Sequence, residues 1–406
     1  MPYQQNSKGF WRVTSAVSAA SLVTFFNLYL VQPLLPVFAQ DYQLSALGAS
    51  AMLSAAMLGM AVGLLLLASL SDALGRRKIL LLSIAVVPSL SLLIGLAHPS
   101  SFYALIGLRF IQGFCLAGVP AVAIAYLAEQ LDARALVKAV GIFIAANSLG
   151  GIGGRLLGGW SADLLGSWQM AFVVVALLSL VMAGSVLMLL PTERATSIQP
   201  WRLSQSMRHY LGHLRNPQLV CAYLVGGIGF GVFINQFSYL TFILAEAPYS
   251  LPASLTSLLF LSYLGGTFTA SSSGRIAQRY GGKRCIILGL LVMSLASLLS
   301  LVDHLGMILL AMVISSMGFF FSHAQASAWV NQHATQAKAS ASALYTITYY
   351  IGAASGGALM QPFYSAWGWA GIVLFSLVAL LSVALIAQRF LSEADPLASL
   401  PTILPR

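Results

Sequence analysis

Twelve long apolar runs, separated by short polar turns, constrain the fold of this chain more than any other feature of its sequence. Each run has about 20 residues, the length that an α-helix needs to cross the hydrocarbon core of a bilayer. Only 7% of the 406 residues are charged, against about 25% in soluble domains. Lipid admits only helices and closed barrels, and these runs rarely alternate, so the sequence predicts an all-α membrane protein.

We expect twelve transmembrane helices. Their predicted positions are 14–38, 48–71, 78–97, 101–128, 136–160, 168–190, 218–245, 253–274, 282–302, 305–330, 340–364 and 368–390. Lys8 and Arg12 precede the first run, as they would in a signal peptide, but the run continues to Phe38 and is too long for a signal core. Within this run, Pro33 and Pro36 predict a bend.

Lysines and arginines are distributed unevenly among the turns. Eighteen of the twenty lie at the termini or in the turns near residues 75, 134, 200, 280 and 335. The alternate turns carry acids instead, namely Asp41, Asp163, Glu246 and Asp303. The positive-inside rule therefore predicts that both termini are cytoplasmic. The net charge of +10 follows from this topology, so we expect no nucleic-acid partner.

The polar turn after the second run is repeated in the second half of the chain. The first copy contains Asp72, Gly75, Arg76 and Arg77. The second copy, 206 residues later, contains Gln278, Arg279 and Gly281. A pair of glycines in the fifth run also recurs in the eleventh, as Gly150 and Gly154, then Gly352 and Gly356. This duplication predicts two pseudo-symmetric six-helix bundles, at 1–190 and 218–390, with a binding site between them.

The two halves are joined by a basic cytoplasmic linker at 191–217. It contains Trp201 and four arginines, Arg194, Arg202, Arg208 and Arg215. Two interpretations are equally supported: an amphipathic segment that lies on the anionic inner leaflet, or a solvated flexible linker. The proline-rich end of the chain, 391–406, is predicted to be a flexible tail.

Two motifs carry a resemblance to a known family. Residues 68–78 are similar to the signature turn G-x-L-x-D-R-x-G-R-K of the major facilitator superfamily, without its opening glycine and the arginine after the acid. The second copy has both, as Gly274 and Arg279, but Gln278 replaces the acid. The motif R-x-x-Q-G of the fourth span is present at residues 109–113. The chain therefore resembles this superfamily along essentially its whole length.

A third motif, G-x8-G-x3-G-P-x2-G, is found in the fifth span of the superfamily's proton-coupled antiporters. Its glycines are present here as Gly141, Gly150, Gly154 and Gly158, but Arg155 stands where the proline belongs. The stretch 30–36, Leu-Val-Gln-Pro-Leu-Leu-Pro, resembles the bacterial branch that includes sugar-efflux and drug-efflux-like permeases.

The resemblance implies a secondary active transporter of the bacterial cytoplasmic (inner) membrane, not an enzyme. It would export a small polar organic solute, such as a sugar, a metabolite or a drug-like molecule, by proton antiport and alternating access. The proton gradient would be the energy source, without a cofactor, and one chain would work as a monomer in the lipid bilayer. Two alternatives stay open: proton-coupled uptake of an organic anion, and a transport-inactive membrane receptor or scaffold.

Charged candidates for the mechanism lie in the repeated turns and in two spans. The resemblance implies that the turns act as a gate, in which Asp72 pairs with Arg76 or Arg77; the alternative is that the bases only anchor topology. Arg109 lies inside the fourth span and should face a wet cavity or a partner. It either couples to protons or substrate, or is a structural arginine bonded to carbonyls or to Gln112. Arg155 either serves the cavity or a gate, or pairs with Asp163.

Uncharged polar residues within the spans complete the candidate set. They are Asn27, Gln32, Asn147, Asn235, Gln236, His323, Gln325 and Tyr349. Each is about as suited to bonding between helices as to contacting a ligand. The unperturbed pKa of a histidine is about 6.5, so His323 is a candidate proton carrier; the alternative is a neutral packing histidine. Cys115, Cys221 and Cys285 form no metal or disulfide pattern, and no nucleotide-binding loop is present, so we expect no metal.

Overall fold

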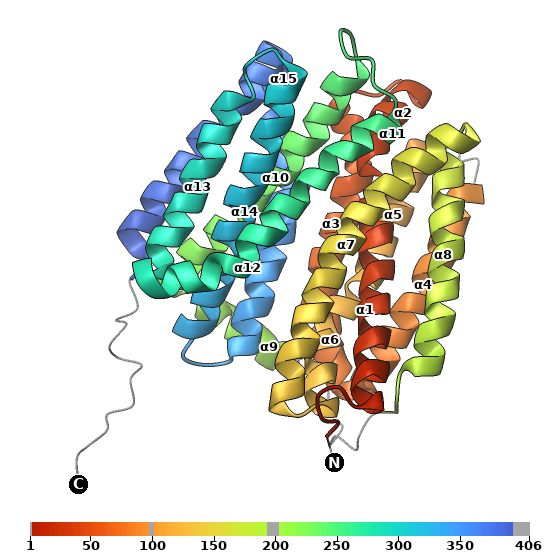
Figure 1. Ribbon diagram of the computed structural model, residues 1–406, viewed down its shortest axis with the longest axis vertical. Helices are drawn as coiled ribbons and strands as arrows, with labels where there is room; N and C mark the ends of the chain where they lie inside the picture. The colour runs from red at the N-terminus through yellow and green to blue at the C-terminus, as the bar shows by residue number, and fades with distance from the viewer. Residues whose placement is uncertain (1, 97–100, 193–202, 393–406) are drawn as a thin grey trace. The chain divides into compact units, whose positions relative to one another are not determined.

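The computed structural model describes residues 2–96, 101–192 and 203–392, and they fold almost entirely into α-helices (Figure 1). A single isolated β-bridge joins Tyr3 and Leu131 within that part of the chain. The tail predicted at 391–406 lies outside the described residues from 393 onward, as do 193–202 of the linker.

The helices of the first half begin with α1 (Lys8–Tyr29), which continues through the 3-10 turn η1 (Gln32–Leu34) into α2 (Leu35–Asp41). Pro33 lies in η1 and Pro36 in the first turn of α2, so the α-helix is interrupted where the sequence predicts a bend. The following helices are α3 (Ala46–Leu74), α4 (Arg76–Leu96), α5 (Phe102–Leu116), α6 (Gly118–Gln130), α7 (Ala133–Leu165) and α8 (Trp168–Leu189).

A short helix, α9 (Leu203–Leu214), precedes the helices of the second half. These are α10 (Pro217–Ala245), α11 (Ala253–Ser257), η2 (Leu258–Ser262), α12 (Tyr263–Tyr280), α13 (Gly282–Leu299), α14 (Leu305–His333) and α15 (Lys338–Phe390). Eleven helical segments in the described residues are long and apolar enough to cross a membrane. The longest, α15, is interrupted at Trp367 and Gly368, so it holds two of the predicted spans and the count of twelve is confirmed.

Local sequence signals fix several helix ends. Ser7 and Asp132 cap α1 and α7, because their side chains accept hydrogen bonds from the backbone N–H groups of Phe10 and Ala135, at 3.1 and 2.8 Å. At the other end of α7, Gly166 adopts a positive φ of 72°, which residues with a side chain rarely adopt. Helix α7 begins several residues before the predicted span and ends several residues after it, because the caps lie outside the apolar run.

The described chain packs into two compact units. One contains the residues up to Met207 together with Ile234–Leu261 and Ala353–Gln361, and the other contains the remainder. The division between the units cuts through helices, including α10 and α15, so it reflects packing rather than a division between covalent modules. The two six-helix bundles predicted from the sequence, with a boundary at 191–217, stay a prediction.

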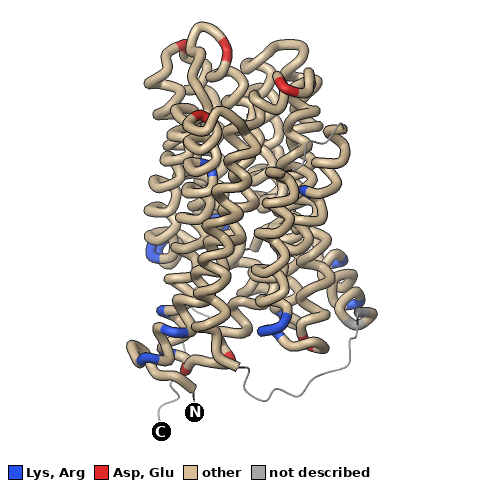
Figure 2. The backbone as a smooth tube through the Cα atoms, turned by 90° about the vertical axis from the view of Figure 1, so that its right-hand side faces the viewer, with Lys and Arg blue, Asp and Glu red and all other residues tan. Residues whose placement is uncertain are grey.

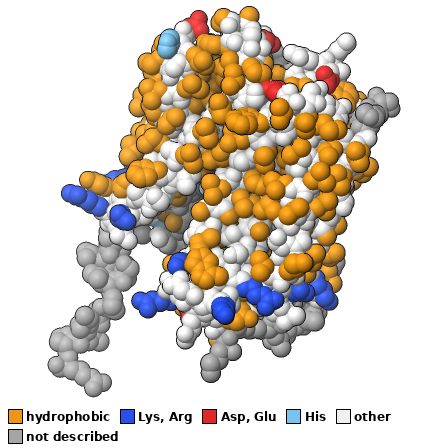
Figure 3. Space-filling view, turned by 45° about the vertical axis from the view of Figure 1, so that its right-hand side comes forward, with side chains coloured by type: hydrophobic (Ala, Val, Ile, Leu, Met, Phe, Trp, Pro, Cys, Tyr) orange, Lys and Arg blue, Asp and Glu red, His pale blue; other side chains and the backbone are white. Residues whose placement is uncertain are grey.

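Charged residues lie mainly near the ends of the helices along the backbone tube of Figure 2. In the first unit, the turn between α3 and α4 carries Arg76, Arg77 and Lys78, whereas Asp41 and Asp163 lie in the last turns of α2 and α7. Hydrophobic side chains cover much of the surface drawn in Figure 3. This distribution suits helices whose middle lies in hydrocarbon and whose ends lie in water.

Candidate functional site

Arg109 lies completely buried on α5 and is bonded to the backbone of two other helices. Its Nε donates to the carbonyl of Met52 on α3 at 3.0 Å. Its Nη1 and Nη2 donate to the carbonyls of Asn27 and Leu28 on α1, at 2.9 and 2.8 Å. Nη1 also donates to the Oε1 of Gln112, one turn further along α5. Backbone carbonyls of two helices and the side chain of Gln112 are therefore the hydrogen-bond partners of this arginine.

The polar network around Arg109 extends to two more helices. The amide of Gln112 donates to Ser91 on α4 at 2.6 Å, and Ser91 donates to the side-chain oxygen of Asn27. The Asn27 amide donates to Ser179 on α8 at 2.8 Å. All these groups are buried and bonded to one another, which corresponds to the structural alternative for Arg109. A direct contact of Arg109 with protons or solute stays a prediction.

Gly113, the last residue of the R-x-x-Q-G motif, allows this network to form. A side chain there would contact the backbone of Ala56, since its Cβ would lie 2.7 Å from the Ala56 Cα. Ala56 lies one turn after Met52 on α3. The glycine therefore brings the α3 backbone close enough for the Met52 carbonyl to reach Arg109.

Arg155 forms a second buried cluster, on α7. Its guanidinium lies between two aromatic rings, 3.9 Å from the centroid of Tyr29 and 4.6 Å from that of Phe260. Its Nε donates to the Oε1 of Gln32 at 2.7 Å, and its Nη1 donates to the carbonyl of Gly151 at 2.7 Å. Only 1% of Arg155 is exposed. Desolvation of this cation is thus offset by two hydrogen bonds and two ring faces.

Gln32 links the Arg155 cluster to α10. Its amide donates to the carbonyl of Ile234 at 3.1 Å and to the hydroxyl of Ser238 at 3.0 Å. Asp163, the alternative partner for Arg155, instead accepts a hydrogen bond from the backbone N–H of Ser254 at 2.7 Å. A cavity of about 260 Å³ lies nearby and is lined by Pro33, Pro36, Val37, Gln40, Asp163, Ala245, Ser250, Leu251, Pro252, Ala253 and Thr256.

The glycines of the fifth-span motif pack α7 against α1. A Cβ at Gly154 would lie 2.7 Å from the Phe26 Cα, and one at Gly158 would lie 3.2 Å from the Leu30 Cα. The first glycine of the repeated pair packs in a similar way, since a Cβ at Gly352 would lie 2.8 Å from the Cα of Gly227 on α10. In both halves, this motif therefore lets two helix backbones approach closely.

His323, on α14, lies among aromatic side chains. Its Nδ1 is 2.9 Å from the hydroxyl of Tyr345 on α15. Its ring stacks on Phe319 with 5.6 Å between centroids and lies 4.9 Å from Tyr349. Tyr349 also stacks on Phe230 of α10, at 3.6 Å between centroids. The structure thus brings the predicted residues His323 and Tyr349 together, with Tyr345 as the hydrogen-bond partner of the histidine.

The remaining predicted polar residues serve separate contacts. Asn147 accepts a hydrogen bond from Ser21 of α1. Gln325 donates to Ser273 of α12 at 2.8 Å. Asn235 donates to the carbonyl of Ala353 at 3.0 Å, and Gln236 is fully buried. These bonds join neighbouring helices, as expected for polar residues that hold helices together in lipid.

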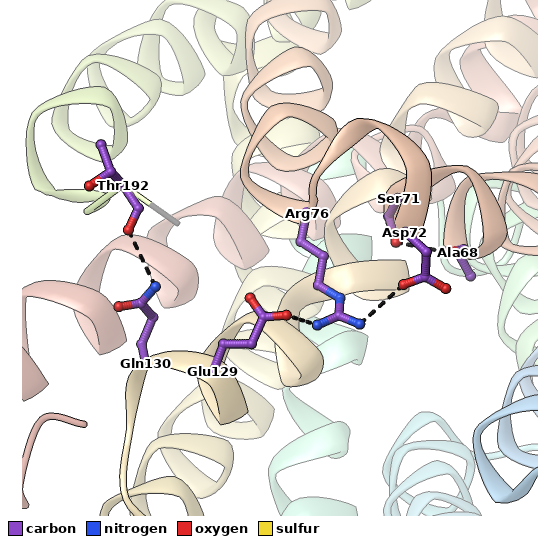
Figure 4. Close-up of polar contacts among 7 residues, drawn as sticks. All are labelled: Ala68, Ser71, Asp72, Arg76, Glu129, Gln130 and Thr192. Atoms are coloured by element: carbon purple, nitrogen blue, oxygen red, sulfur yellow. Dashed lines mark hydrogen bonds and ion pairs between the residues drawn. The ribbon is translucent and has the colours of Figure 1, made fainter. Parts of the chain in front are cut away.

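The basic turn between α3 and α4 contains an ion-pair cluster (Figure 4). Arg76 lies between Asp72, at 3.1 Å, and Glu129 at the end of α6. Gly75 adopts a φ of 95°, and Gly281 in the second copy a φ of 88°. A positive φ at the same place explains why both turns retain the glycine.

The other residues of the predicted gate have different surroundings. Arg77 donates to the carbonyl of Leu190 at 3.4 Å. Gln278 and Arg279 are exposed, and the Arg279 guanidinium lies 5.4 Å from the ring of Tyr280. Because Gln278 replaces the acid in the second turn, this turn has no counterpart of the ion pair between Asp72 and Arg76.

Side chains from three helices hold the backbone where α8 ends. Arg12 of α1 donates to the carbonyls of Met188 and Leu189, at 3.3 and 2.8 Å. From α6, Tyr126 donates to the carbonyl of Pro191 at 2.7 Å. In the second half, Trp329 of α14 similarly donates to the carbonyl of Ser392 at 3.2 Å. Each half therefore anchors the end of its last span with an aromatic residue from its fourth.

Several site residues were missed by sequence reasoning. Ser91 and Ser179 complete the Arg109 network, Tyr29 and Phe260 enclose Arg155, and Glu129 pairs with Arg76. Serines and aromatic residues are common in apolar runs and give no signal there, whereas an acid at the end of a span, opposite a basic turn, could have indicated Glu129. No group of three or more His, Cys, Asp or Glu side chains suited to a metal occurs in the described residues.

Comparison with known proteins agrees with this architecture. Among solved structures, a variant of the nucleoside transporter NupG is similar with a TM-score of 0.75 and 14% identity, covering 94% of this chain and 100% of that one. A D-xylose-proton symporter is similar with a TM-score of 0.69 and 16% identity, covering 95% and 99%. These likenesses show a common fold.

Sequence relatives are closer. The uncharacterized MFS-type transporter YybF of Bacillus subtilis is 32% identical over 364 residues, 90% of this chain and 89% of that protein. The inner membrane transport protein YnfM of Escherichia coli is 32% identical over 383 residues, 94% and 90%. The profile of the Major Facilitator Superfamily matches residues 17–357 and 244–405. The chain therefore belongs to the Major Facilitator Superfamily of secondary transporters.

Proposed function

We propose that this transporter exports a small polar organic solute in exchange for protons. The observation that carries the proposal is the packing of α7 on α1 through Gly150, Gly154 and Gly158, three of the four glycines of the antiporter-type motif. Arg155, which replaces the motif's proline, bonds with Gln32 and the aromatic rings and leaves this glycine contact intact. The close approach associated with the antiporter motif is thus retained despite the substitution.

His323 is the proposed proton carrier. It is a titratable side chain within a span, and its hydrogen bond to Tyr345 gives a proton a defined partner. Arg109 would hold the backbone of α1 against α3 and α5 during transport. Asp72, Arg76 and Glu129 would form a contact at the cytoplasmic end that is made in one conformation and broken in the other. Both termini would be cytoplasmic, with the chain in the bacterial inner membrane.

Uptake of an organic anion with protons is the second candidate. Two buried arginines, Arg109 and Arg155, favour it, because a positive interior attracts anions. The two candidates differ in the direction in which protons move relative to the solute.

The test uses purified protein in liposomes that enclose a pH-sensitive dye and start with an acidic lumen. A thermal-shift screen of sugars, amino acids, organic acids and antimicrobials first selects a solute that stabilises the protein. With the membrane potential clamped, adding this solute outside should make the lumen alkaline if protons leave as it enters. Acidification of the lumen would indicate symport instead.

Two controls separate transport from leakage and from simple binding. Protein-free liposomes should show no pH change on addition of the solute. A solute that raises the melting temperature but causes neither a pH change nor its own entry would contradict transport and favour the receptor alternative. The variant Tyr345→Phe, which removes the hydrogen-bond partner of His323, should retain solute binding but lower the proton flux.

A further inference from the structure

Helix α9 differs from the spans in length and polarity. Its 12 residues extend over about 18 Å, which is too short to cross a bilayer. One face is covered by the protein, since Tyr210 and His213 are only 7% and 8% exposed. Leu211 and Leu214, on the adjoining side of the helix, are instead 58% and 47% exposed. Two large apolar side chains are therefore left uncovered by the described chain on this helix.

Exposed arginines flank these leucines. Arg208 lies three residues before Leu211, on the same side of α9, and Arg215 directly follows the last residue of the helix. The sequence from 194 to 245 contains four arginines and no acid. The uncovered face is therefore both apolar and cationic, and it has no neighbouring carboxylate in the sequence to neutralise it.

The connection to α10 fixes the depth at which this face lies. The membrane-spanning helix α10 begins at Pro217, three residues after α9 ends. The join is tight, because Asn216 donates its backbone N–H to the carbonyl of His213 at 3.1 Å. Its side chain also accepts from the backbone N–H of Gln218 at 3.0 Å. With so short a connection, α9 has to lie where α10 enters the membrane.

We propose that α9 is an interfacial helix that binds the headgroup layer of anionic phospholipids. Leu211 and Leu214 enter the boundary between headgroups and acyl chains, and Arg208 and Arg215 contact lipid phosphates. Charge complementarity selects this partner, since each basic side chain raises the affinity for a leaflet with anionic lipids by about fivefold. Removing both arginines should then weaken the association of the helix with the leaflet by about 25-fold.

The experiment places a polarity-sensitive fluorophore on α9 of the full-length protein in nanodiscs. The background lacks the native thiols through Cys115→Ala, Cys221→Ala and Cys285→Ala, and Leu211→Cys carries the label. Nanodiscs contain either phosphatidylcholine alone or phosphatidylcholine with 30% phosphatidylglycerol. Quenching by lipids that carry a nitroxide near the headgroup reports contact with lipid, and quenching by iodide reports contact with water.

We expect lipid quenching and a blue-shifted emission in the anionic nanodiscs. In phosphatidylcholine alone, at high salt, or in the variant R208Q/R215Q, we expect iodide quenching in place of lipid quenching and the blue shift. The matched control, Lys8→Gln with Lys338→Gln, removes the same charge from exposed lysines elsewhere and should behave as the parent. Gel filtration of each variant confirms that it remains folded.

Three results would overturn the proposal. Iodide quenching in anionic nanodiscs would place Leu211 in water. Protection from both quenchers would mean that protein, such as a second copy of the chain, covers the face. Equal lipid quenching with and without phosphatidylglycerol, or in R208Q/R215Q, would show an interfacial helix that does not select anionic lipid.

Discussion

Replacing Gly113 by alanine tests how the R-x-x-Q-G motif works. The added methyl group would lie 2.7 Å from the Ala56 Cα and closer still to the Ala56 carbonyl oxygen. Ordinary contact begins near 3.4 Å, so α3 has to move away by at least about 0.7 Å. Met52 lies on the same face of α3, one turn earlier, and would move with it. The 3.0 Å bond from Arg109 to Met52 would then exceed the length of a hydrogen bond.

The expected loss of stability has two parts. Overpacking of a close helix contact costs about 1–3 kcal/mol, and loss of a hydrogen bond to a charged group costs about 1.5–3 kcal/mol. Together they predict a destabilisation of about 2.5–6 kcal/mol, or a fall in apparent Tm of roughly 5–12 °C. The same strain should reduce transport, because the network that positions α1 is disturbed.

Thermal unfolding in detergent, followed by the reaction of a thiol dye with Cys115, Cys221 and Cys285, measures the change. The matched control is Gly107→Ala, on the same helix, where a methyl group meets no atom within 4 Å. This variant should keep or raise the Tm, since alanine favours helix by about 1 kcal/mol. If Gly113→Ala behaves like Gly107→Ala, the close contact of α3 with α5 does not set the position of Arg109.

Three further substitutions test the other clusters. Arg155→Lys keeps the charge but loses the planar stacking on the rings and the geometry of the hydrogen bonds. We expect a fall in Tm equivalent to about 1–3 kcal/mol and slower transport. An unchanged Tm and flux would refute the role of this cluster. Tyr345→Phe should shift the pH profile of transport with little change in Tm, whereas an unaltered profile would exclude His323 as the proton carrier. Arg76→Gln should slow transport. It should change the free energy of unfolding by no more than about 1 kcal/mol, because the ion pair with Glu129 lies near the surface. Normal flux would show that the basic turn only sets topology.

The fold was predictable from the sequence because membrane helices depend on local composition. The apolar runs are long, the breaks are short, and the charged residues lie at the ends, so span positions follow almost directly. The interruption of α15 at Trp367 and Gly368 falls in the predicted gap between the last two spans. The helix ends differ by several residues because caps such as Asp132 are polar and lie outside the hydropathy signal.

The candidate site was only partly predictable. Arg109, Gln112 and Asn27 were identified because polar groups in an apolar span need partners, and the structure brings all three into one network. Carbonyls and Gln112 were one of the alternatives predicted for Arg109, but the helices that supply the carbonyls could not be predicted, because backbone carbonyls leave no trace in the sequence. For Arg155, the sequence left a choice between a cavity or gate and Asp163, whereas in the structure the guanidinium contacts Gln32, Gly151 and two aromatic rings.

Contacts between residues far apart in the chain explain the remaining gaps. The aromatic ring of Phe260 meets Arg155 across more than 100 residues of sequence, and no spacing rule connects them. The pairing of Glu129 with Arg76 likewise depends on how α6 packs on α4. The periodicity within a helix shows which face is polar, but not which other helix that face meets.

Accumulation of a radiolabelled solute in proteoliposomes tests the proposed coupling most directly. The solute is the one that stabilises the protein in the thermal-shift screen, and the vesicles carry an imposed pH gradient of either sign. Antiport predicts accumulation above the outside concentration only when the lumen is acidic, and its loss when the gradient is collapsed. Accumulation only with an alkaline lumen, or equilibration that ignores the gradient, would contradict the account.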